Sequence, residues 1–431
     1  MIQIKILHLS DLHFGIQKTH DYGYLYRRPE IIKNFFDDFN EQITAKGWNP
    51  DIIVISGDLG WFGQKDEYIK SPDETDDTFV SFQHFLEKLL SVSDVSIDKV
   101  ICCPGNHDKQ IPKSVKSNLF RTVKTLDQSA IKSITPFYSD YSHSMREIGI
   151  QPFENDYSQD TAFGGAGVEY LFGYRLIDRV CFIVLNSTWL CDYRKKTDKG
   201  YLLGNRLFYD VSMWYRTKHP GADPFSHIVI YHHPDDWFNS DERMRKSEHD
   251  RSLYDDIRLF SNTGPIILNG HIHNSEDTSD RHSLRRTSGT LSSNDVHQYI
   301  SSQCWLYDIS FNEQYPRASS VKLGKYYSYL DEKTSVYHWR FDTMGQQFFS
   351  SDYASNQMIE QIIVLCNEDP CLANYVVDEY GEVEALFQLD LSSLFNLYFR
   401  IFADPVFRDA IKQSTKRLIK VKTPIYGDEK L

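Results

Sequence analysis

Five short segments of the sequence combine aspartate, asparagine and histidine in a way that suits metal chemistry. They are DLH at 11–13, GD at 57–58, GNHD at 105–108, HH at 232–233 and HIH at 271–273. Imidazole nitrogens together with carboxylate or amide oxygens are typical ligands of divalent transition metals. Each segment alone is equally well explained as a polar turn. Taken together, each at the end of a strand-like run, they predict one composite metal site.

The stretch ILHLSDLHFG, residues 6–15, illustrates the spacing. Successive side chains of a strand point to opposite faces, so Asp11 and His13 are expected to point the same way from the end of a buried strand. His271 and His273 repeat this spacing. Glycine lies at or beside most of these turns, where tight backbone geometry is expected: Gly15, Gly57, Gly105 and Gly270.

The runs that carry these segments read as strands buried on both faces. They are DIIVISGD at 51–58, VICCPGNHD at 100–108, VCFIVLNST at 180–188, HIVIYHHP at 227–234 and PIILNGHIH at 265–273. Amphipathic helices are predicted between the first of them, at 29–47 and 78–92. This alternation predicts an α/β fold, in which functional groups gather beyond the carboxyl ends of the strands.

The remaining segments differ in character. Residues 109–168 are polar, include FGGAG at 163–167, and are interpreted as a cap or insertion. Three further strands, at 304–311, 321–329 and 335–341, are expected to form a second sheet or the second half of a sandwich. From about residue 353 the pattern becomes helical and acidic, so 351–431 is predicted to be a small helical appendage and a candidate interaction module.

Composition narrows the class of protein. A chain of 431 residues with 41% hydrophobic and 14% aromatic residues builds a folded core. The net charge of -13 argues against a protein that coats nucleic acid or an acidic membrane, although a local basic groove remains compatible with it. We expect no membrane span and no signal peptide. Seven cysteines without a CxxC pair favour reduced thiols and a cytoplasmic location.

The ordered series DLH, GDL, GNHD, HHP and GHIH resembles the calcineurin-like metallophosphoesterases. That superfamily includes cyclic-nucleotide phosphodiesterases, nucleotide phosphatases and a group of nucleases. The resemblance covers roughly residues 1–345 and implies a four-layered αββα sandwich with a two-metal site. The expected organisation is therefore a metallophosphoesterase domain at 1–350, interrupted by the insertion, followed by the helical appendage.

The resemblance also implies a role for each site residue. It assigns one metal to Asp11, His13 and His273, and the other to Asn106, His232 and His271, with Asp58 bridging them. The usual alignment of HHP selects His232 rather than His233. His107 is implied as a general acid that does not bind metal, and Asp108, grouped with it as catalytic, as a residue that orients its neighbours.

The chemistry implied is metal-assisted phosphoester hydrolysis. By this resemblance, two divalent cations would supply an activated hydroxide and polarise the phosphoryl group, and His107 would protonate the leaving oxygen. A mixed nitrogen and oxygen set favours Mn, with Fe, Zn or Ni as alternatives.

Basic residues close to the motifs are candidate phosphate ligands. Lys109, Lys113, Lys116, Arg121 and Lys124 follow GNHD, and Arg285 lies shortly after GHIH. Among them, Lys109, Lys113 and Arg285 are predicted to bind substrate. A solvated helix face is an equally good explanation of the lysine-rich run.

Three functions are compatible with the sequence. The first is a phosphodiesterase that acts on nucleotides or nucleic acid. The second is a phosphomonoesterase that acts on nucleotides or proteins. The third is a non-catalytic metal-bound scaffold or effector subunit that works by binding a protein partner, for which 351–431 is the candidate surface.

Overall fold

The computed structural model describes most of the chain. The described residues are 2–15, 25–27, 29–75, 79–115, 126–159, 167–178, 180–192, 205–219, 226–234, 237–238, 266–273, 276–277, 284–291, 293–295, 302–312, 317–348, 353–381, 385–386, 389 and 391–415.

The first sheet has six strands in the order β14-β13-β12-β1-β3-β4. Its parallel part consists of β1 (Ile2–Leu9), β3 (Ile52–Ile55) and β4 (Val100–Cys102). Its antiparallel part consists of β12 (Gln303–Asn312), β13 (Arg317–Asp331) and β14 (Val336–Phe348).

The last three strands correct the sequence analysis. They extend the first sheet through the pairing of β12 with β1, in which Ile6 lies opposite Tyr307, and they do not form a second sheet. Alternation within a strand reports which side chains share a face, but it does not identify the neighbouring strand. The prediction of a separate sheet was therefore wrong, although all three strands exist.

The second sheet also has six strands, in the order β5-β6-β7-β8-β10-β9. Its parallel centre is formed by β6 (Val180–Val184), β7 (Ser226–Ile230), β8 (Ile266–Asn269) and β10 (Leu284–Thr287). The antiparallel edges are β5 (Gly173–Ile177) and β9 (Glu276–Asp277). A separate ribbon joins β2 (Leu25–Arg27) to β11 (Ser293–Asp295).

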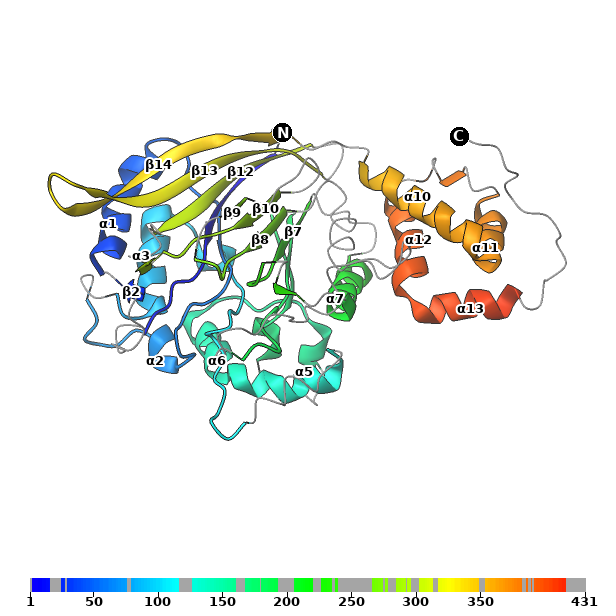
Figure 1. The fold of residues 1–431 in the computed structure, drawn as a ribbon, viewed down its shortest axis with the longest axis horizontal. Coiled ribbons are helices and arrows are strands. Elements are labelled where there is room, and N and C mark those ends of the chain that lie inside the picture. Colours follow the sequence, from blue (N-terminus) through cyan, green and yellow to red (C-terminus); the bar gives the residue numbers. More distant parts are fainter. Residues whose placement is uncertain are drawn as a thin grey trace.

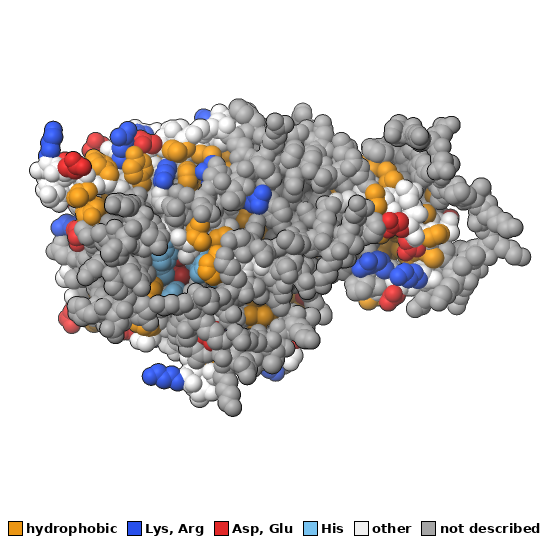
Figure 2. Space-filling view, viewed as in Figure 1, with side chains coloured by type: hydrophobic (Ala, Val, Ile, Leu, Met, Phe, Trp, Pro, Cys, Tyr) orange, Lys and Arg blue, Asp and Glu red, His pale blue; other side chains and the backbone are white. Residues whose placement is uncertain are grey.

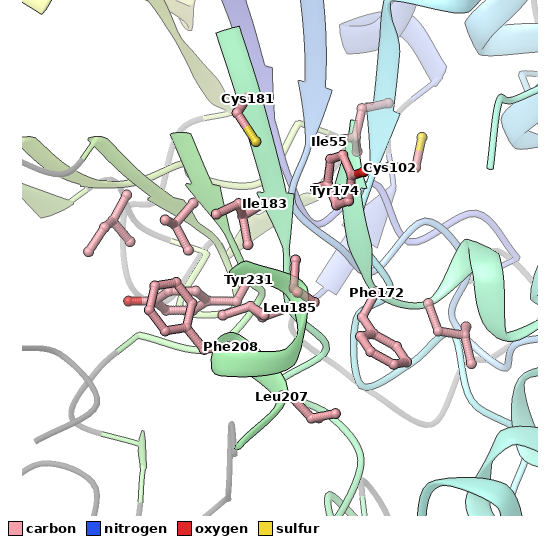
Figure 3. Packing of buried hydrophobic residues seen from close by; sticks show 14 of the residues in the cluster. Ile55, Cys102, Phe172, Tyr174, Cys181, Ile183, Leu185, Leu207, Phe208 and Tyr231 are labelled. Atoms are coloured by element: carbon pink, nitrogen blue, oxygen red, sulfur yellow. The ribbon is translucent and has the colours of Figure 1, made fainter. Parts of the chain in front are cut away.

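The two sheets stack face to face with helices outside them (Figure 1). Alternate strand residues, such as Ile6 of β1 and Ile228 of β7, form one buried cluster between the sheets. The opposite face of the first sheet is covered by α1 (Pro29–Phe39) and α3 (Phe82–Ser93). On the second sheet, Ile183 and Leu185 lie near Leu207 and Phe208 of α7 (Asn205–Lys218), as Figure 3 shows. The predicted four-layered αββα sandwich is confirmed.

The described residues of the segment at 109–168 lie below the sheets in Figure 1. It contains α5 (Gln128–Ile134) and α6 (Ser139–Ile148), and Tyr141 of α6 contacts Tyr68 of α2 (Lys65–Tyr68) edge to face. Of the glycine-rich piece, only Gly167 is among the described residues.

Four helices follow the sheets: α10 (Tyr353–Glu368), α11 (Pro370–Tyr380), α12 (Leu391–Ala403) and α13 (Pro405–Thr415). They pack on one another and, in Figure 1, lie beyond α7 and away from the sheets. The helical character predicted for this region is present, whereas its role as a separate domain remains a prediction. Among the described helices, none combines the length and the apolar composition that crossing a bilayer requires.

Candidate metal centre

The candidate ligands come from loops that follow β1, β3, β4, β7 and β8. β1, β3 and β4 belong to the first sheet and β7 and β8 to the second, and the loops at the carboxyl ends of both sets meet at one edge of the sandwich. The carboxylates, amide and imidazoles named by the sequence motifs converge at this edge. The prediction of one composite site is therefore supported by their positions, while their roles as ligands remain predicted.

The backbone that orients Asp11 and His13 is not a strand. β1 ends at Leu9, and both residues lie in the following loop with φ of 53° and 50°. Their N–H groups donate to the carbonyls of Gly57 and Asp58, each at 3.0 Å. The two side chains do face the same point, but the strand alternation offered as the reason was wrong.

The same left-handed backbone recurs at Asp58, His271 and His273, with φ of 55°, 79° and 57°. Residues with a Cβ rarely adopt this conformation because it is sterically unfavourable, and they hold it only where the surroundings enforce it. Five of the seven predicted ligands thus occupy strained backbone, which is a pattern typical of functional sites.

The first donor set consists of Asp11, His13 and His273. Nε2 of His13 lies 2.9 Å from Nε2 of His273 and 3.8 Å from Oδ1 of Asp11, and His273 Nε2 lies 3.6 Å from the same oxygen. A point about 2 Å from all three atoms exists, which is the distance at which such donors bind a metal like Zn²⁺. Oδ1 of Asp11 is buried and has no hydrogen-bond partner among the described residues. The set therefore fits a cation.

The second donor set consists of Asn106, His232 and His271. Oδ1 of Asn106 lies 3.0 Å from Nε2 of His232 and 2.9 Å from Nδ1 of His271, and the two nitrogens are 3.3 Å apart. A point about 2 Å from these three atoms exists as well. Nδ1 of His232 lies 2.8 Å from the carbonyl of Ser56, and donation to it leaves Nε2 as the metal-binding atom.

Asp58 lies between the two sets. Its Oδ2 is 3.2 Å from Nε2 of His232 and 4.0 Å from Nε2 of His13. Its Oδ1 accepts a hydrogen bond of 2.8 Å from the backbone N–H of His107. One carboxylate in contact with both donor sets is the arrangement that a pair of neighbouring cations requires.

The neighbouring histidine, His233, faces a different partner. Its Nδ1 lies 3.0 Å from Oγ of Ser187, and its backbone N–H donates to the same oxygen at 3.0 Å. Its ring nevertheless lies 4.4 Å from that of His271. The contacts of His232 with Asn106 and Asp58 favour the predicted choice of His232.

Burial and mutual charge set the protonation of the site. Burial alone would lower the pKa of His232, but the carboxylates of Asp58 and Asp11 raise it to about 9. For Asp58, burial acts to raise the pKa, yet the positive charges of His232 and His107 hold it well below its usual value. Burial lowers the pKa of His13 and His271 well below the usual value, so both imidazoles are neutral. Cation binding must then displace a proton from His232.

Two glycines make room for these contacts. A Cβ at Gly57, where φ is 104°, would lie 2.5 Å from Nδ1 of His232. A Cβ at Gly105 would collide with the backbone N and Oδ1 of Asp58. Glycine at these strand ends is therefore required for the close approach of the ligand loops.

His107 lies beside the donor sets without joining them. Its ring stacks on Trp61, with centroids 4.2 Å apart, and lies 5.2 Å from the ring of His13. Its Nδ1 lies 2.9 Å from the carbonyl of Trp61. Donation from Nδ1 to this carbonyl leaves Nε2 as the ring atom that exchanges a proton.

Asp108 connects the loops that carry the ligands by hydrogen bonds, and it is not part of either donor set. Its carboxylate accepts from the backbone N–H groups of Leu59, Gly60 and Gly105 and from the hydroxyl of Tyr68, at 2.8 to 3.2 Å. Burial, followed by the nearby charge of Asp58, raises its pKa to about 6. The predicted orienting role agrees with this geometry, whereas its grouping with the catalytic residues does not.

Lys109 is a correction to the predicted substrate-binding residues. It is fully buried, and its Nζ donates to the carbonyls of Thr188, Trp189 and Cys191 at 3.2, 2.8 and 2.8 Å. A buried ammonium held in this way joins the GNHD loop to the loop after β6 and is not presented to substrate. Sequence spacing could not reveal this, because the acceptors are backbone atoms distant in the sequence.

The other basic residues predicted to bind substrate are not buried as Lys109 is. Lys113 is exposed, and Arg285 is partly buried on β10. Lys116, Arg121 and Lys124 lie outside the described residues. Substrate binding by Lys113 and Arg285 remains a prediction.

Sequence reasoning missed two aromatic neighbours of the centre, Trp61 and Trp237. Trp237 meets His271 edge to face, with centroids 4.2 Å apart, and Trp61 stacks on His107. Each tryptophan follows a ligand motif within the same loop, and this was the one available signal.

Comparison with known proteins agrees with this geometry. A family model described as calcineurin-like phosphoesterase matches residues 4–275, more than half of the chain. No curated protein sequence matches significantly.

Solved structures that match this chain include a purple acid phosphatase from yellow lupin (Lupinus luteus) seeds, with 10% identity and a TM-score of 0.40. The match covers 80% of this chain and 53% of the phosphatase, so the chain spans about half of that protein. A putative 5'-nucleotidase from Staphylococcus aureus has 14% identity and a TM-score of 0.35, with 80% of this chain and 54% of the other covered. Vps29 of Chaetomium thermophilum has 9% identity and a TM-score of 0.31, with 80% and 100% covered.

Proposed function

The chain belongs to the calcineurin-like phosphoesterase family, a family of phosphoester hydrolases, and from this premise we propose that it hydrolyses phosphodiester bonds of nucleotides or nucleic acid. The proposal concerns the bond that is cut, the metals and the role of each residue.

One observation carries the choice of a diester. His107 lies outside both donor sets, yet its backbone is hydrogen-bonded to Asp58 and its ring is held by Trp61. A histidine fixed beside two cations is suited to protonate a leaving alkoxide, which is the demanding step for an unactivated diester. A phosphomonoesterase on nucleotides or proteins is the alternative outcome of the test below.

The proposal assigns metal binding and proton transfer to separate side chains. Asp11, His13 and His273 would hold one cation, Asn106, His232 and His271 the other, and Asp58 both. When bound, the cations would supply an activated water and neutralise phosphoryl charge. Nε2 of His107 would carry the proton to the leaving oxygen, while the hydrogen bond from Nδ1 to the Trp61 carbonyl keeps the ring oriented.

We propose a divalent transition metal, with Mn as the first ion to test, because mixed nitrogen and oxygen donors favour Mn, Fe, Zn or Ni over Ca. A cytoplasmic setting is supported by seven free cysteines, six of which are buried. The helices α10–α13 are proposed as the surface that binds a protein partner.

The experiment is a cleavage assay after chelation and reconstitution with Mn. End-labelled single- and double-stranded DNA, RNA, cyclic nucleotides and nucleoside monophosphates are tested with the wild type and His107→Ala. Diester cleavage by the wild type and loss in the variant support the proposal. Cleavage of monoesters alone, at equal rates in both proteins, would replace it with the phosphomonoesterase.

A further inference from the structure

Aromatic side chains border the two ends of the metal centre. At one end, the ring of Trp61 lies 4.9 Å from that of His13 and 4.2 Å from that of His107. At the other end, the ring of Trp237 lies 4.2 Å from that of His271 and 6.0 Å from that of His233. The end at Trp61 includes His13 of the first donor set, and the end at Trp237 includes His271 of the second donor set.

Each end also offers an aromatic group to solvent. Trp61 is 6% exposed, but Phe62 beside it is partly exposed and meets it edge to face at 6.4 Å. Trp237 is partly exposed as well. Figure 2 shows hydrophobic side chains on the surface directly beside histidines and an acidic side chain. Partly exposed rings next to a charged centre are suited to hold a flat apolar group.

The two ends differ chemically. A phosphodiester carries two organic groups, one of which leaves with the proton supplied by the acid. His107, the proposed acid, lies at the end of Trp61 and Phe62, so the leaving group belongs at that end. The retained group then belongs at the end of Trp237.

We propose that Phe62 and Trp237 determine substrate specificity by binding two flat aromatic groups, such as nucleobases, on either side of the scissile phosphate. Phe62 contacts the leaving group and Trp237 the retained group. This inference rests on the proposed function and deepens it by naming how the substrate is recognised. Lys109 does not recognise the substrate, because its ammonium group donates to three backbone carbonyls. Contacts with aromatic side chains would supply this recognition instead.

Three diesters separate the two contacts. Thymidine 5′-(p-nitrophenyl phosphate) has an aromatic group on each side. Methyl p-nitrophenyl phosphate lacks the retained base, and thymidine 5′-(methyl phosphate) lacks the aromatic leaving group. Base stacking on an aromatic side chain is worth about 1–3 kcal/mol, which corresponds to about 5- to 150-fold in affinity.

With Mn bound, Trp237→Leu is expected to lower kcat/KM for both thymidine diesters by this factor and to leave methyl p-nitrophenyl phosphate within about twofold. Phe62→Leu is expected to lower kcat/KM for both p-nitrophenyl diesters and to leave thymidine 5′-(methyl phosphate) unchanged. The matched control is Trp214→Leu, because Trp214 is also partly exposed but packs on Tyr157 and Phe172. It should change none of the three.

Uniform losses on all three diesters, or no loss, would overturn the inference, because packing alone would affect every substrate alike. The failure of the proposed function looks different: the wild type with two metals bound would cleave none of the diesters. Calorimetric binding of thymidine 5′-phosphate and methyl phosphate then decides the retained-group contact. The inference stands if Trp237→Leu removes the preference for thymidine 5′-phosphate, and it fails if the preference is absent or unchanged.

Discussion

The backbone N–H of His107 donates a hydrogen bond of 2.8 Å to Oδ1 of Asp58. The main chain therefore fixes the position of the proposed acid, His107, relative to the proposed bridging ligand, Asp58. Substitution of the His107 side chain leaves this hydrogen bond in place, so chemistry and metal binding can be separated experimentally.

His107→Ala should retain metal and lose turnover. General acid help is typically worth about 10²–10⁴-fold, so the loss should approach this size for a dinucleotide and be small for a p-nitrophenyl ester, whose leaving group needs little protonation. Steady-state kinetics on both substrates, with metal content measured alongside, checks this. Full activity of His107→Ala on the dinucleotide would remove His107 as the acid.

Asp58→Ala should lose metal and activity together, because its carboxylate contacts both donor sets. Metal content by mass spectrometry should fall from two ions towards none after dialysis, and added Mn should no longer raise the melting temperature, as it does when a ligand binds only the folded state. Asp178→Ala is the control, since Asp178 is exposed and pairs with Lys99. Two tightly bound ions in Asp58→Ala would contradict the bridging role.

Lys109→Met should destabilise the protein. The change leaves three backbone carbonyls without their buried donor, at a cost of about 1–3 kcal/mol or more in the free energy of unfolding. Urea denaturation measures the effect, and Lys113→Met, at an exposed position, should be neutral. If Lys109 instead bound substrate, KM would rise and the free energy of unfolding would stay constant.

The buried ring of His8 should make the stability of the folded protein depend on pH. Its ring is buried, with Nδ1 3.1 Å from the Tyr307 hydroxyl and Nε2 2.9 Å from the Ser56 hydroxyl, and burial lowers its pKa to about 3. The unfolded chain binds this proton near pH 6.5, whereas the folded chain does not, so stability is lost as the pH falls from 6.5 towards 3.

The His8 contribution has a limiting slope of about 1.4 kcal/mol per pH unit. His8→Gln should flatten the stability profile between pH 6 and 4, relative to the wild type, in parallel urea titrations. His143→Gln, at a largely exposed position, serves as the control. Identical profiles for His8→Gln and the wild type would show that His8 is not the group responsible.

The sequence predicted much of this architecture because its buried strands carry continuous apolar runs. The strands at 51–58, 100–108 and 265–273 exist, with shorter limits, as β3, β4 and β8. The donor positions were accessible for the same reason, since the motifs follow the carboxyl ends of parallel strands.

The sequence could not reveal contacts made by the backbone or between distant segments. The left-handed conformations of Asp11 and His13 depend on hydrogen bonds to Gly57 and Asp58. The placement of β12 beside β1 depends on tertiary pairing. In both cases the local structure depends on a segment that is distant in the sequence, and residue type alone does not identify that segment.

The pairing of β12 with β1 also bears on how the protein can be divided. β12 accompanies β1 from Ile2 opposite Phe311 to His8 opposite Trp305, although the family match ends at 275. A fragment that stopped at 275 would expose the whole length of β1 as an apolar edge, and unprotected edges of this kind recruit other chains. Such a fragment would carry every proposed ligand and still leave β1 uncovered, so a workable catalytic unit has to extend at least through β12 to Asn312.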